Sequence, residues 1–201
     1  MHYRQKNTVT LAKDVALFLS VFVALFLATT SILFLAEEKK QRLELVNNLK
    51  SVGTAYYAYY LDTSMELPLV NNGNNWEVNP VPLVSDDIVG WQGPYISLPI
   101  REDGVSLGFK GFDHLTLARA TDEKWNSLQD LEAKSCYNIE SENKDCYTWI
   151  VLRANDKLVD KLAVYLENYI EEDKNIAKGK VRASDDYKYL FVELGLSDVN
   201  R

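Results

Sequence analysis

Hydrophobic and polar positions divide the chain into three stretches, the first of which is almost entirely apolar. Residues 15–36 form a run of 22 positions without a charged side chain, most of them Val, Ala, Leu, Ile or Phe. As an α-helix this run would be roughly 33 Å long, enough for a hydrocarbon core of roughly 30 Å. The pattern predicts a transmembrane helix over residues 15–36, preceded by a cytoplasmic leader-like segment over residues 1–14.

The second stretch, residues 37–61, is polar with a single apolar stripe. Leu, Val and Tyr side chains recur there at spacings of four, three, four and three, which places them on one face of a helix. The stripe consists of Leu45, Leu49, Val52, Tyr56 and Tyr59. Neither Pro nor Gly interrupts the junction with the apolar run, so we expect one unbroken helix with an amphipathic second half.

The third stretch, residues 62–201, is long enough for one globular head. Its first part, residues 62–85, is rich in Asn, Pro and Gly and predicts a long surface connection. Patterns typical of strands follow at residues 105–109, 147–154 and 187–194, and helical patterns at residues 122–134 and 156–172. These elements predict an α+β fold in which the amphipathic helix packs on a small antiparallel β-sheet.

One local motif in the head has a direct conformational consequence. Trp91 and Tyr95 flank the dipeptide Gly93-Pro94. Pro fixes its own φ and restricts the residue before it, while Gly tolerates backbone angles closed to other residues. We therefore expect a structural turn, with the two aromatic rings packed on the helix beneath.

Composition and charge narrow the functional classes. The net charge is −7, and no stretch concentrates Lys and Arg, so we expect no nucleic-acid partner. The chain has two histidines, and neither His2 nor His114 accompanies a motif with a nucleophilic Ser or Cys. Phosphate-binding glycine loops are also missing from the sequence. We expect no enzymatic activity and no cofactor.

The only two cysteines, Cys136 and Cys146, bracket a short acidic segment. A disulfide between them would need an oxidising compartment, which would place the head outside the inner membrane and the N-terminus in the cytoplasm. The alternative is a pair of unrelated buried thiols, and the lack of neighbouring His residues argues against a zinc site.

The order of these features resembles that of type IV pilins and of the pseudopilins of type II secretion. The shared features are a basic leader, a hydrophobic helix with an amphipathic continuation, a long loop, and a C-terminal pair of cysteines. Two short sequences add to the resemblance: Trp-Gln-Gly-Pro-Tyr-Ile at residues 91–96, and Gly-Lys-Val-Arg at residues 179–182 after an acidic turn.

The resemblance implies a structural subunit that assembles into a filament through its hydrophobic helix. Its partners would be membrane lipid, other pilin-like subunits, prepilin peptidase and an inner-membrane assembly platform. The processing region would then comprise Thr8, Val9, Thr10, Leu11 and Asp14. Asn7 and Thr8 stand where the family has a small residue, and Asp14 is the first acidic residue of the chain.

Some pseudopilins bind calcium in a C-terminal loop, and this chain has oxygen-bearing side chains in a comparable place. They are Glu171, Glu172, Asp173 and Asn175. Carboxylate and amide oxygens suit calcium, although the spacing matches no EF-hand. The alternative is a solvated salt-bridge surface, since Lys174, Lys178 and Lys180 lie close by in the sequence.

A second functional class stays open beside the filament subunit. The chain would then be a single-pass membrane anchor that presents an extracytoplasmic binding or sensing domain and never polymerises. A cleaved signal peptide is a further interpretation of the N-terminus, but Phe34 stands where a small residue would precede the cleavage site.

Overall fold

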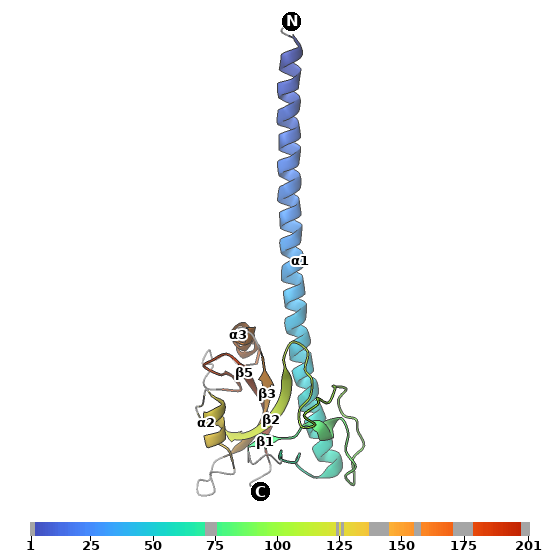
Figure 1. The fold of residues 1–201 in the computed structure, drawn as a ribbon, viewed down its shortest axis with the longest axis vertical. Helices are drawn as coiled ribbons and strands as arrows, with labels where there is room; N and C mark the ends of the chain where they lie inside the picture. Colours follow the sequence, from blue (N-terminus) through green and yellow to red (C-terminus); the bar gives the residue numbers. More distant parts are fainter. Residues whose placement is uncertain are drawn as a thin grey trace. The chain divides into compact units, whose positions relative to one another are not determined.

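A computed structural model describes the backbone of most of the chain (Figure 1). The described residues are 3–70, 76–123, 125, 127–136, 145–154, 158–170 and 179–197. The side chains of residues 3–19, 21, 24, 25, 28, 158, 160, 161, 167 and 170 lie outside the description. The chain divides into an N-terminal unit, residues 1–45, and a C-terminal unit, residues 46–201.

Helix α1 (Tyr3–Thr63) is continuous. It contributes to both units, because the boundary between them falls inside it. Its last turn is closed by the Thr63 hydroxyl, which donates to the Tyr59 carbonyl at 2.7 Å. Ser64 follows with a φ of 55°, a left-handed conformation that ends the helix.

The C-terminal unit contains a five-stranded antiparallel sheet with the order β1-β2-β3-β5-β4 (Figure 1). The strands are β1 (Glu77–Val78), β2 (His114–Thr121), β3 (Cys146–Arg153), β4 (Val181–Ala183) and β5 (Tyr189–Leu196). A 3₁₀ turn η1 (Val81–Leu83) and the helices α2 (Leu128–Ala133) and α3 (Leu158–Ile170) complete the unit. The α+β class with a small antiparallel sheet is therefore confirmed.

Two layers of side chains build the core of this unit. One cluster joins Trp149 and Val151 of β3 to Phe191 of β5, and Trp125 and Leu131 pack against it. The other layer is the stripe of α1, where Leu49, Val52, Tyr56 and Tyr59 are all buried. Successive strand residues face opposite sides of the sheet. Leu190, Phe191 and Val192 are all buried, so both faces of the sheet are covered at this point.

A bulge in β5 fits the sheet to α1. Thr148 pairs with Gly195 and Trp149 pairs with Glu193, so Leu194 has no partner in the ladder. The Tyr57 hydroxyl donates to the Leu194 carbonyl at 3.0 Å. The helix thus uses a carbonyl group that the bulge releases from strand pairing.

Several sequence-based element predictions need correction. The strand expected at residues 105–109 does not form, and Leu107 makes only isolated bridges to Ile100 and Leu115. The helix expected at residues 122–134 begins later, at Leu128, because the Ser127 hydroxyl caps it by accepting from the Asp130 amide at 3.0 Å. Sequence reasoning also missed β2, where Leu115 and Leu117 alternate with polar residues but Ala118 breaks the pattern.

Candidate functional site

The described side chains of the apolar run are uncovered. Eight large hydrophobic side chains there are exposed by 55% to 76%. They are Phe22, Val23, Phe26, Leu27, Ile32, Leu33, Phe34 and Leu35. A contiguous apolar surface of this kind is rare on monomeric soluble proteins and marks a site that contacts lipid or another protein.

Three consecutive hydroxyl side chains interrupt the apolar surface. Thr29 donates to the Phe26 carbonyl at 2.9 Å, and Thr30 and Ser31 both donate to the Leu27 carbonyl, at 3.0 and 2.8 Å. Each hydroxyl donor is therefore satisfied within the helix, which lowers the cost of placing it in apolar surroundings.

Charged residues follow the apolar run directly. Arg42 pairs with Glu38 one helical turn away, and Lys40 lies 3.9 Å from the Glu37 carboxylate. Both pairs are within reach of solvent and stabilise the helix only slightly. These charged residues mark the C-terminal end of the exposed apolar surface.

The side chains of the predicted processing region all lie outside the description. This region comprises Thr8, Val9, Thr10, Leu11 and Asp14. Within the described residues, no helix is both long enough and apolar enough to cross a membrane.

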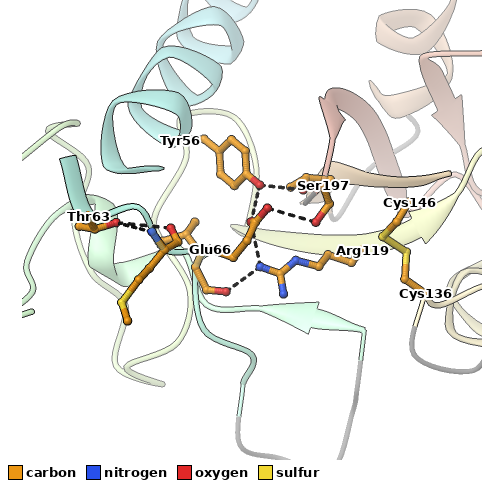
Figure 2. Close-up of polar contacts among 10 residues, drawn as sticks. Tyr56, Thr63, Glu66, Arg119, Cys136, Cys146 and Ser197 are labelled. Carbon is orange, nitrogen blue, oxygen red and sulfur yellow. Dashed lines mark hydrogen bonds and ion pairs between the residues drawn. A yellow bond between two sulfur atoms is a disulfide. The ribbon is translucent and has the colours of Figure 1, made fainter. Parts of the chain in front are cut away.

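A buried polar cluster fastens the end of α1 to the sheet (Figure 2). Glu66, in the loop after α1, accepts hydrogen bonds from the Tyr56 hydroxyl at 2.6 Å and from Arg119 Nη2 at 3.0 Å. Arg119 also donates to the Leu67 carbonyl at 2.8 Å. The Ser197 hydroxyl donates to the other Glu66 oxygen at 3.3 Å, so α1, β2 and the end of β5 meet at one carboxylate.

The environment of this cluster keeps the Tyr56 phenol neutral. Burial raises the pKa of Tyr56 well above its usual range, and the neighbouring Glu66 carboxylate raises it further. Tyr56 also shares a hydrogen bond of 3.1 Å with the Thr148 hydroxyl of β3. The cluster therefore joins α1, β2, β3 and the end of β5.

The predicted turn lies against the last turns of α1. The Tyr95 hydroxyl donates to Asp62 Oδ2 at 2.9 Å, and its ring packs edge-on against Tyr59. Trp91 Nε1 donates to the Pro82 carbonyl at 2.8 Å, and the Gly93-Pro94 peptide bond is cis. A Cβ on Gly93 would lie 2.6 Å from the Trp91 ring, so only Gly fits there.

Tyr59 attaches the segment that precedes this turn to α1. Its hydroxyl donates to Asp86 Oδ2 at 3.3 Å. Burial, followed by the nearby Asp86 carboxylate, raises the pKa of Tyr59 to about 12. The loop between α1 and β2 is therefore attached to α1 through two tyrosines, Tyr59 and Tyr95.

Cys136 and Cys146 form a disulfide, as the sequence predicted, with their Cα atoms 5.8 Å apart. The bond joins the end of the α2 segment to the first residue of β3. The Cys146 carbonyl accepts from the Ser197 amide at 2.7 Å, so the bridge lies beside the end of β5.

Arg182, the last residue of the Gly-Lys-Val-Arg sequence, is a buried structural residue of β4. Its guanidinium carbon lies 4.4 Å from the Trp125 ring centroid and 4.5 Å from that of Trp149. Its nitrogens donate to the carbonyls of Gly179, Glu123 and Asp122. The stacked, multiply bonded guanidinium pins the segment before α2 to the sheet.

The predicted calcium ligands Glu171, Glu172, Asp173 and Asn175 lie outside the described residues. Among the residues that are described, no group of three His, Cys, Asp or Glu side chains is arranged to hold a metal ion. The possible calcium site stays a prediction.

His114 begins β2 and lies among charged neighbours. Partial burial lowers its pKa, and Arg153 and Arg101 lower it further. The carboxylates of Asp103 and Asp113 act in the opposite direction and raise the pKa of His114.

Comparison of the chain with protein-family models, curated proteins and solved structures finds no match.

Sequence reasoning missed the polar cluster around Glu66. A signal was present in β2, where Arg119 occupies a position that alternation assigns to a buried face. A charged residue at such a position requires a partner of opposite charge. The sequence does not show that Glu66, 53 residues earlier, would be that partner.

Proposed function

We propose that the chain is a structural subunit of a type IV pilus-like filament or a type II secretion pseudopilus, which assembles through its hydrophobic N-terminal helix. The observation that carries the proposal is the exposure of Phe22, Phe26, Ile32 and their neighbours on α1. Burying such side chains is worth roughly 1.5–3 kcal/mol each, so a stable state of the chain must cover them.

The architecture of the chain supports this role. One helix, α1, carries the exposed apolar surface and also supplies buried side chains to the core of the C-terminal unit. A subunit built in this way can polymerise through one part of the helix while the other part holds a folded unit. In the proposal the apolar surface contacts lipid first and the helices of neighbouring subunits after assembly.

In the proposal, each part of the chain has a defined location relative to the inner membrane. The chain is a single-pass inner-membrane protein before assembly, with its N-terminus in the cytoplasm. The C-terminal unit is periplasmic or, in a surface filament, extracellular, and an oxidising compartment there suits the Cys136–Cys146 disulfide. Prepilin peptidase and an inner-membrane assembly platform are the proposed processing and assembly partners.

The alternative is a single-pass anchor that presents an extracytoplasmic binding or sensing domain. Asn7 and Thr8, in place of the small residue that precedes the peptidase cleavage site, favour this alternative. Mass spectrometry of the N-terminus of the chain purified from membranes separates the two. The filament proposal predicts a shortened, methylated N-terminus, whereas an intact Met1 supports the anchor.

A further inference from the structure

We propose that Arg101, His114 and Arg153 form a binding site for a phosphate group on the surface of the C-terminal unit. His114 is the first residue of β2, Arg153 is the last residue of β3, and Arg101 belongs to the loop of residues 99–108 that precedes β2. The ligand would be a phosphomonoester or a phosphorylated lipid headgroup, bound through its phosphate oxygens. This site goes beyond the proposed function, because it uses no residue of the apolar run.

The backbone of Asp113 brings both arginines beside His114. Its amide donates to the Arg153 carbonyl at 2.7 Å, and its carbonyl accepts from Arg101 Nη1 at 2.5 Å. His114 is also the direct partner of Arg153 in the β2–β3 ladder. Directly paired residues of antiparallel strands project from the same face of the sheet, with Cβ atoms about 4.5–5.5 Å apart. The imidazole and the Arg153 side chain therefore share one face of the sheet.

The loop that carries Arg101 is held in place by its own hydrogen bonds. The Arg101 amide donates to the Ser106 carbonyl at 3.0 Å, and the Asp103 carboxylate accepts from the Ser106 amide at 2.9 Å. Leu107 exchanges two backbone hydrogen bonds with Leu115 of β2, at 3.0 and 2.8 Å. A donor held on such a support loses little conformational entropy when a ligand binds.

The three side chains keep donors available for a ligand. Among the described residues, the Arg153 guanidinium and the His114 imidazole have no hydrogen-bond or ion-pair partner, and Arg101 donates only to the Asp113 carbonyl. Arg101 and Arg153 are exposed, and His114 is partly exposed. A terminal phosphate group offers three strong acceptor oxygens, which matches two guanidinium groups and one imidazole.

The charges around His114 favour an additional anion. After burial, Arg153 and Arg101 have the largest influence on the pKa of His114, ahead of the carboxylates of Asp103 and Asp113. The Asp103 carboxylate is already engaged, because it accepts from groups of its own turn, the Ser106 amide and hydroxyl among them. A phosphate group placed here would offset the two guanidinium charges and favour the protonated imidazole.

Nuclear magnetic resonance of the imidazole signals tests the proposal in the full chain, held in a non-ionic detergent that contains no phosphate. The chain has two histidines, so His114→Gln identifies the His114 signal by its disappearance. Inorganic phosphate, added at constant ionic strength, should shift this signal to saturation and raise the pKa of His114. In a second arm, phosphatidic acid in the micelles replaces inorganic phosphate and presents the same group on a lipid headgroup.

Variants of Arg153 test whether the guanidinium binds the phosphate. Arg153→Gln should weaken phosphate binding by about fivefold, because an exposed charge pair is lost. Arg153→Lys keeps the positive charge and should lose less. Unfolding followed by tryptophan fluorescence checks that each variant is folded.

The matched control is Lys188→Gln, which removes a positive charge close to Arg153. The Lys188 carbonyl accepts from the amide of Ala154, the residue after Arg153, but the Lys188 ammonium group is paired with Asp186. This variant should therefore change phosphate affinity by less than about twofold.

Two outcomes would overturn the proposal. The first is a His114 signal that responds neither to inorganic phosphate nor to phosphatidic acid. The second is an equal loss of affinity in Arg153→Gln and Lys188→Gln, which would indicate general charge attraction. A response to phosphatidic acid alone would support the site and assign it to a lipid headgroup, whereas a response to inorganic phosphate would support it as a site for a soluble phosphomonoester.

Discussion

At the scale of single residues, buried Arg119 pairs with Glu66, whose side chain is 19% exposed. Replacing Arg119 by Met would leave the mostly covered Glu66 carboxylate without its guanidinium partner, so we predict a loss of about 3 kcal/mol in the free energy of unfolding. Chemical denaturation followed by tryptophan fluorescence, with the chain in detergent, measures it.

The matched control is Lys188→Met, which removes the ammonium group of an exposed pair with Asp186. Its expected loss is below about 0.5 kcal/mol. Equal losses for the two variants would show that the Glu66 cluster contributes no more than a surface ion pair.

Tyr59 gives a prediction about alkaline pH. Because the folded state raises the pKa of Tyr59 to about 12, its contribution is complete below the ordinary tyrosine pKa of about 10. That contribution is lost as the pH rises from about 10 through about 12. We predict that stability falls above about pH 10, and that Tyr59→Phe makes the fall shallower.

Unfolding curves recorded between about pH 8 and about pH 11 test this prediction. Tyr57→Phe is the control, because Tyr57 is half exposed and its hydroxyl bonds to a carbonyl group. An unchanged pH profile for Tyr59→Phe would be evidence against the phenol as a source of the alkaline loss.

At the scale of elements, the joint between α1 and β5 depends on Gly195. Its φ is 150°, and a Cβ there would lie 2.2 Å from the Tyr57 hydroxyl oxygen. Gly195→Ala should therefore cost at least about 2 kcal/mol, by backbone strain and by displacing Tyr57. Thermal or chemical unfolding of the variant measures the loss.

Gly104→Ala is a well-matched control for this element. Gly104 also has a positive φ, of 68°, but a Cβ there would meet nothing within 4 Å. It should lose only about 1 kcal/mol. If Gly195→Ala costs no more than Gly104→Ala, the close approach of Tyr57 does not constrain the joint.

The elements also show where sequence reasoning succeeds. The stripe of Leu49, Val52, Tyr56 and Tyr59 is periodic over several helical turns, and all four residues are buried. β3 and β5 lie close to the predicted ranges because their long apolar runs are distinctive.

The failures have local physical causes. Trp125 fits the helical spacing of residues 122–134, but it lies before α2, and its ring serves the core beside Trp149. β1 and β4 are two and three residues long, so no periodic pattern could reveal them. The Glu66 cluster joins residues that are distant in sequence, which a single sequence cannot pair.

At the scale of the whole molecule, the disulfide provides a further prediction. Replacing Cys136 and Cys146 together by Ser should lower the free energy of unfolding by about 2–3 kcal/mol, because the unfolded chain regains the freedom of the closed loop. Reduction of the unmodified chain should have a similar effect. Unchanged stability after complete reduction would contradict a structural role for the bridge.

The central claim is that the exposed apolar part of α1 binds other copies of the chain. Photo-crosslinking from a benzoyl-phenylalanine placed at Phe26, in the full chain in membranes, tests this most directly, with the same probe at Ile100 as the control position. The account predicts covalent multimers of the chain from Phe26 and none from Ile100. Crosslinks from Phe26 to lipid alone, with the chain remaining monomeric, would contradict it.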